Sequence, residues 1–161
     1  MFTKQEAQEL FEYKNGELFW KKQKPCYAKL NKGAGWIDKT TGYRRVFANG
    51  KYEYVHRLIF LMHHGYVPKM IDHIDGDPLN NNLSNLREAT KAQNIYNAKA
   101  PYTNTTGCKN VYFEKRSGKW FVKFVINGKQ KMFGKFNDFI EAQQSAEKTR
   151  SFLHGDYARN A

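Results

Sequence analysis

The stretch that decides the fold is residues 71–94, which read IDHIDGDPLNNNLSNLREATKAQN. Two short strands are predicted, at 70–74 and 86–89, on either side of a loop rich in Asp, Gly, Pro and Asn, the residues that favour turns. Thr90 with Gln93 has the capping-box pattern, which predicts a helix over 91–98. The order strand, loop, strand, helix indicates a small α+β unit.

Polar side chains of a particular kind gather in this unit. Asp72 and His73 end the first predicted strand, where the following turn breaks the alternation and lets both face one site. Asn94 lies at the first full turn of the predicted helix, able to face back toward Asp72. A carboxylate and an amide oxygen are hard donors that suit Mg²⁺ or Mn²⁺. A neighbouring histidine, with an unperturbed pKa of about 6.5, is a candidate general base toward water.

The charge of the chain is strongly positive and unevenly spread. The 161 residues carry 27 Lys+Arg against 15 Asp+Glu, a formal net charge of +12. Residues 1–71 hold 13 basic and 6 acidic side chains, residues 101–161 hold 11 and 5, and residues 72–100 hold only 3 and 4. Such a charge implies an acidic partner, nucleic acid first and an anionic membrane surface second. The near-neutral centre suggests a place that holds a cation.

Several classes of protein are excluded by the same sequence. The longest apolar run, 58–62, is far shorter than the roughly 20 residues that a membrane-spanning helix needs. The N-terminus has no apolar signal-peptide segment, and Cys26 and Cys108 are too isolated for a disulfide framework or a metal clip. No His and Cys spacing matches a structural zinc site. We therefore expect a soluble, cytoplasmic protein that binds nucleic acid, with no obligate protein partner evident.

Flanking elements complete the predicted fold. Upstream, Thr3 and Glu6 predict the start of a helix that continues to about Tyr13, and the Asn15-Gly16 turn predicts a strand at 18–20. A basic loop at 21–35 follows. A hairpin is then predicted with 43–48 paired to 52–55, followed by a helix around 58–62 that ends at Gly65. Downstream of a polar linker at 101–106, it predicts strands at 111–114, 120–126 and 130–133 and a helix from about 138 to Gly155. The expected organisation is an α+β protein of two domains, 1–100 and 107–161.

The predicted tail domain, residues 107–161, is a small three-stranded antiparallel sheet packed on one helix. In its middle strand Trp120 and Phe124 share one face, which we expect to form the core. Lys119 and Lys123 flank Phe121 on the other face, and that face is the better candidate for DNA contact.

The central segment resembles the HNH homing endonucleases of phages, the ββα-metal nucleases. The resemblance rests on VHRL at 55–58, IDHIDG at 71–76, NN at 81–82, NLR at 85–87 and QN at 93–94, with a motif core at 55–98. His73 is followed by Asn85 twelve residues on and by Asn94 nine further. An Asn at the third motif position matches the HNN variant and favours Mg²⁺ or Mn²⁺ over Zn²⁺.

This resemblance implies a metal-dependent endonuclease that hydrolyses phosphodiester bonds of double-stranded DNA and leaves 3′-hydroxyl and 5′-phosphate ends. Asp72 and Asn94 would ligate one divalent metal, and His73 would be the general base. Asn85 would orient His73 and brace the loop. Arg57 and Arg87 join Lys119 and Lys123 as candidate DNA contacts.

The tail domain resembles the DNA-binding domain of plant ethylene-response factors, which is often fused to phage HNH nucleases. The resemblance rests on Gly107, VYF at 111–113, KW at 119–120, GKF at 134–136, EA at 141–142 and Gly155.

Other interpretations stay open at this stage. A non-catalytic DNA-binding regulator would share the charge pattern, and RNA or membrane-surface binding is a weaker rival. Asp75-Gly76-Asp77 fails as a calcium loop, because a loop with Gly76 at position six would begin at Ile71, which has no carboxylate. His56 has two interpretations. It either supports the site or contacts phosphate, or it is a structural histidine that is hydrogen-bonded at the start of its helix.

Overall fold

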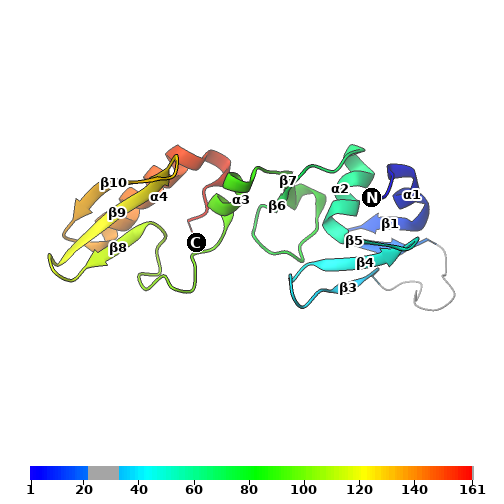
Figure 1. The fold of residues 1–161 in the computed structure, drawn as a ribbon, viewed down its shortest axis with the longest axis horizontal. Coiled ribbons are helices and arrows are strands. Elements are labelled where there is room, and N and C mark those ends of the chain that lie inside the picture. Colours follow the sequence, from blue (N-terminus) through cyan, green and yellow to red (C-terminus); the bar gives the residue numbers. More distant parts are fainter. Residues whose placement is uncertain (22–32, 161) are drawn as a thin grey trace. The chain divides into compact units, whose positions relative to one another are not determined.

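The computed structural model describes residues 1–21 and 33–160, which form two compact units, Met1–Lys91 and Ala92–Ala161 (Figure 1). Most of the predicted basic loop at 21–35, with Cys26, lies outside the described residues. The boundary of the compact units comes ten residues before the predicted linker, and independent domains joined at 101–106 stay a prediction.

The first unit begins with a helix and a hairpin. Helix α1 (Lys4–Leu10) starts at the expected capping box, in which Thr3 and Glu6 bond to each other's backbone N–H. The prediction that this helix continues to about Tyr13 is wrong, since β1 (Phe11–Lys14) instead pairs antiparallel with β2 (Glu17–Trp20). Asn15 and Gly16 both have positive φ, as a two-residue hairpin turn requires. The hairpin buries Phe11 completely and so outcompetes the last helical turn.

A second sheet supports the central helix. Strands β4 (Arg44–Ala48) and β5 (Lys51–Tyr54) form the predicted hairpin, and the unpredicted short strand β3 (Trp36–Ile37) pairs with β4. Helix α2 (Val55–His64) follows β5 directly and ends, as predicted, at Gly65 in the left-handed conformation. It packs on α1, β4 and β5, and its buried side chains form the centre of the core (Figure 1).

The segment at 70–89 folds as the sequence predicts. Strands β6 (Ile71–His73) and β7 (Leu86–Glu88) pair antiparallel, with Asp72 opposite Arg87 and His73 opposite Leu86. A 3₁₀ turn, η1 (Leu83–Asn85), leads the loop back into β7.

The second unit contains α3 (Lys91–Asn97), which belongs to it from Ala92 on, and a three-stranded antiparallel sheet in the order β10-β9-β8. The strands are β8 (Val111–Glu114), β9 (Lys119–Ile126) and β10 (Lys129–Phe136), and α4 (Phe139–His154) packs against the sheet. A 3₁₀ turn, η2 (Gly155–Tyr157), follows. Phe124 is buried and Trp120 packs on the same core, which confirms the predicted inner face. Within 1–21 and 33–160, no helix is both long and apolar enough to cross a bilayer.

Candidate active site

The β6–β7 hairpin places Asp72 and His73 side by side in an enclosed position. Their side chains are only 4% and 5% exposed, although both are polar. Buried polar groups are retained only where hydrogen bonds or opposite charges compensate for the lost water. The contacts of these two residues therefore define the site.

Asp72 is held by the residue directly opposite it on β7. Both Nε and Nη2 of Arg87 lie 2.8 Å from Oδ2 of Asp72. Nε donates a hydrogen bond to this oxygen and Nη2 adds an ion-pair contact, and a hydrogen bond between two charged groups is among the stronger ones in proteins, so the carboxylate has a defined direction. Arg87, a candidate DNA contact by sequence, is thus engaged with the predicted metal ligand, and its contact with DNA stays a prediction.

His73 contacts an amide that the sequence assigns only to the loop. Its Nε2 lies 3.0 Å from Oδ1 of Asn81, a buried residue whose Nδ2 donates to the carbonyl of Leu79. Since the amide oxygen accepts, Nε2 of His73 is the donor, and the lone pair of the neutral ring is then on Nδ1. Asn81 therefore fixes the tautomer that a general base needs. The pair Asn81-Asn82 is part of the recognised motif, which is the signal that could have identified it.

Asn85 braces the loop that follows His73. Its Nδ2 donates to Oδ1 of Asp75 (2.9 Å) and to the carbonyl of Asn80 (2.8 Å), and its Oδ1 accepts from the N–H of Asp75 (3.1 Å). Partial burial opposes ionisation of Asp75, but hydrogen bonds from Asp77, Asn85 and Asn80 outweigh it and lower the pKa. Asp75 and Asp77 both accept from backbone N–H groups two residues on, which confirms them as turn formers.

His56 packs behind His73 in a cluster of rings. Its ring centroid lies 5.3 Å from that of His73, 5.0 Å from Tyr43 and 5.6 Å from Tyr54. The side chain is 7% exposed, and Nδ1 has no hydrogen-bond partner among the residues that the structure describes. Burial, followed by the nearby His73 and Arg57, lowers the pKa of His56 to about 3. His56 is therefore a neutral packing group at neutral pH rather than a cation presented to phosphate.

The predicted metal ligands have the chemistry of a magnesium site. Asp72 supplies an oriented carboxylate in the first unit, while Asn94 lies on α3 in the second, so their pairing stays a prediction. In the described ranges, no three His, Cys, Asp or Glu side chains gather as a metal site. Two oxygen donors fit Mg²⁺, which commonly keeps several waters and takes one or two protein ligands.

The remaining candidate DNA contacts differ in their surroundings. Arg57 lies 3.3 Å from Oε1 of Glu53 and donates to the carbonyl of Pro68, so it is engaged within the first unit. Lys119 donates to Oδ1 of Asn137. Lys123 lies over the ring of Phe121 at 5.2 Å, and Lys135, which the sequence did not single out, lies over the same ring at 5.3 Å. We call the surface formed by Tyr112, Phe121, Lys123 and Lys135 the basic face of the sheet.

The comparisons with known proteins give one family match and two viral relatives. Residues 53–96 match the HNH endonuclease family. The chain is 41% identical over 97 residues to Protein 3.8 of Escherichia phage T7, covering 59% of this chain and 79% of that protein. It is 38% identical over 79 residues to Uncharacterized HNH endonuclease L560 of Acanthamoeba polyphaga mimivirus, covering 47% of this chain and 41% of that protein. No solved structure matches the chain.

Proposed function

Because the chain belongs to the HNH endonuclease family, we propose that it cuts double-stranded DNA by metal-dependent hydrolysis of phosphodiester bonds, with His73 as the general base. The observation that carries this proposal is the arrangement of His73 itself. The ring is enclosed, follows a carboxylate fixed by Arg87, and has its Nε2 proton held by Asn81. Such a histidine has one defined nitrogen with which to accept a proton from water.

The roles of the other residues follow from their contacts. Asp72 and Asn94 would hold Mg²⁺ or Mn²⁺, and the bound ion would stabilise negative charge on the scissile phosphate and on the leaving 3′ oxygen. His73 would take the proton of the attacking water as the oxygen bonds to phosphorus and the P–O3′ bond breaks. Asn85 would keep the loop after His73 in place through its three hydrogen bonds. The products would be a 3′-hydroxyl and a 5′-phosphate.

The biological setting that best fits is a phage homing-type endonuclease acting in the cytoplasm of the bacterial host. Its support is the relative from phage T7 together with the HNN pattern of His73, Asn85 and Asn94.

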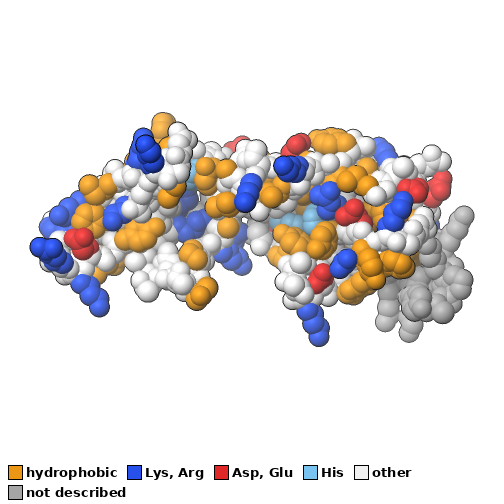
Figure 2. Space-filling model, viewed as in Figure 1, with side chains coloured by type: hydrophobic (Ala, Val, Ile, Leu, Met, Phe, Trp, Pro, Cys, Tyr) orange, Lys and Arg blue, Asp and Glu red, His pale blue; other side chains and the backbone are white. Residues whose placement is uncertain are grey.

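We further propose that the basic face of the sheet binds DNA, in the manner expected of a domain similar to those of ethylene-response factors. Two lysine ammonium groups lie over Phe121, and Tyr112 beside them is exposed, so cations and aromatic rings share one surface. Figure 2 shows that basic side chains, in blue, outnumber acidic ones on the visible face of the molecule. Each phosphate contact lowers the slope of log K against log salt by about 0.9, so Lys123→Met should flatten this slope by nearly one.

A plasmid-nicking assay tests the nuclease. Supercoiled DNA is incubated with wild type, His73→Ala and the matched control His64→Ala, which alters an exposed histidine at the end of α2. With Mg²⁺ or Mn²⁺, wild type and His64→Ala should convert the plasmid, while His73→Ala and EDTA-treated protein should not. If wild type converted no plasmid, a non-catalytic DNA-binding protein would be favoured instead, and if His73→Ala nicked as fast as wild type, His73 would not be the general base. The product, nicked circle or linear DNA, separates nicking from double-strand cleavage.

A further inference from the structure

Helix α3 is too short to be stable by itself. It spans seven residues, and isolated helices of fewer than about 12 residues are marginal in water. Its last turn, residues 94–97, reads NIYN and so has no basic side chain of its own. The final carbonyls of a helix lack intrahelical partners and carry partial negative charge, so they gain from a cation.

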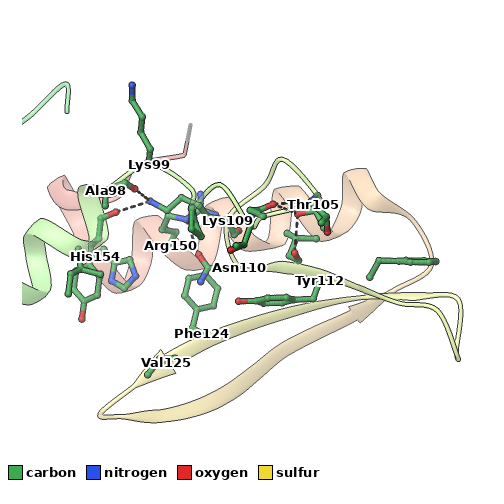
Figure 3. Close-up of a pocket in the computed structure, with 18 residues that line it drawn as sticks. Ala98, Lys99, Thr105, Lys109, Asn110, Tyr112, Phe124, Val125, Arg150 and His154 are labelled. Atoms are coloured by element: carbon green, nitrogen blue, oxygen red, sulfur yellow. Dashed lines mark hydrogen bonds between the residues drawn. The ribbon is translucent and has the colours of Figure 1, made fainter. Parts of the chain in front are cut away.

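Lys109 supplies that cation from thirteen residues beyond Tyr96. Its Nζ donates to the carbonyl of Tyr96 at 3.0 Å and to that of Ala98 at 2.5 Å, and Figure 3 shows the bond to Ala98. From the far end of α4, the ring of His154 stacks on the ring of Tyr96, with centroids 3.7 Å apart and planes 11° apart. Two side chains of the tail domain therefore contact and stabilise the C-terminal end of α3.

Lys109, which we call the anchor of α3, is itself held in place by a buried arginine. Arg150 of α4 is 1% exposed and donates through Nη2 to the carbonyl of Lys109 at 2.6 Å and through Nε to Oδ1 of Asn110 at 3.3 Å. These residues line one cavity of about 560 Å³, which Figure 3 shows between the 98–110 segment, the sheet and α4. Both cations are committed to carbonyl and amide oxygens, so the cluster positions backbone rather than a bound anion.

We propose that Lys109 is a positioning residue that fixes α3, and with it the proposed metal ligand Asn94, to the tail domain. This inference rests on the proposed nuclease function. It gives the tail domain a second task besides holding DNA, because the helix that carries Asn94 is held in place by side chains from beyond residue 106.

The test uses the full chain and three lysine variants. Lys109→Met removes the anchor, Lys109→Arg keeps donors for the two carbonyls, and Lys148→Met removes the same charge from an exposed position of α4. The readouts are the Mg²⁺ concentration for half-maximal nicking, the rate at saturating Mg²⁺, and DNA affinity in EDTA. We expect Lys109→Met to raise the half-maximal Mg²⁺ concentration about tenfold, as loss of a residue that orients a metal ligand does. DNA affinity in EDTA should stay within about twofold, Lys109→Arg should recover most of the effect, and Lys148→Met should match wild type.

Hydrogen exchange distinguishes local loosening of α3 from unfolding of the whole second unit. In Lys109→Met and in His154→Ala, amides of 92–98 should exchange faster while those of β9 stay protected. An unchanged Mg²⁺ requirement in Lys109→Met, or unchanged exchange of 92–98 in both variants, would refute the positioning role of Lys109. If β9 also lost protection in Lys109→Met, that variant would be unfolded more widely and His154→Ala would be the deciding variant. A normal Mg²⁺ requirement in His154→Ala would then refute the proposal that these contacts position α3. Failure of wild type to nick with any divalent metal would refute the proposed function instead, while the exchange experiment would still report on the anchor.

Discussion

The buried ring of His56 makes the first unit sensitive to acid in a way that one substitution should remove. The pKa of His56 is lowered to about 3, by burial first and then by His73 and Arg57. In the unfolded chain the same ring takes up a proton at about pH 6.5. Acid therefore favours the unfolded state, and the stability linked to His56 is complete above pH 6.5 and is lost as the pH falls from there toward 3.

The expected loss follows from these two pKa values. Between pH 7.5 and pH 5.0 the linkage relation gives a decrease in the free energy of unfolding of about 2 kcal/mol. His56→Phe keeps a ring of similar size, removes the titration and leaves no buried Nδ1 without a partner. The variant should be at least as stable as wild type at pH 7.5, since an unsatisfied buried polar atom costs about 1–3 kcal/mol. Its stability should fall by about 2 kcal/mol less than that of wild type on going to pH 5.0.

Urea unfolding measures this difference. In a Trp120→Phe background, the fluorescence of Trp20 and Trp36 reports on the first unit alone. His64→Phe is the matched control, because it makes the same replacement at an exposed histidine of the same helix. If His56→Phe and wild type lost the same free energy between the two pH values, His56 would not be a buried neutral group in the folded protein. Because His56 is neutral and enclosed, DNA affinity should also be the same in wild type and variant.

Three further substitutions test other contacts. Asn85→Ala removes three hydrogen bonds of the loop, each worth about 1 kcal/mol net, so the first unit should lose about 2–3 kcal/mol in urea and nick more slowly at unchanged DNA affinity. An Asn85→Ala protein as stable as wild type would contradict the bracing role. Arg150→Met leaves buried acceptors without a charged donor and should lower the stability of the second unit by about 3 kcal/mol, seen as an earlier thermal transition of that unit alone. In a Cys26→Ser background, Cys108 should react with a thiol reagent at pH 7.5 only after urea unfolds the second unit, because the thiol is buried and burial raises its pKa; rapid labelling of the folded protein would refute this.

Local chemistry explains why much of the fold could be predicted. The turns Asn15-Gly16, Asn49-Gly50 and Asn127-Gly128 all have positive φ, a conformation that few other residue pairs adopt so readily. They set the pairing of the strand residues next to each turn by local geometry. The capping box at Thr3 and the left-handed Gly65 likewise mark helix ends by short-range bonds.

The features that escaped prediction depend on contacts between distant residues. Residues 11–14 have no local signal that separates a helix from a strand, and pairing with 17–20 decides it. Trp36 and Ile37 form a strand only because β4 lies beside them. The contact of Asn81 with His73 depends on the path of the loop, which spacing along the chain does not give.

The two tasks proposed for the tail domain can be separated by point variants but not by truncation. Deleting 101–161 would remove the basic face and also Lys109 and His154, so loss of nicking would not show which of them mattered. Lys123→Met should weaken DNA binding and flatten its salt dependence while the Mg²⁺ requirement stays as in wild type. Lys109→Met should do the reverse, raising the Mg²⁺ requirement at unchanged DNA affinity. If each variant changed both quantities in equal proportion, the tail domain would act as a single structural support, and neither role could be assigned to one surface.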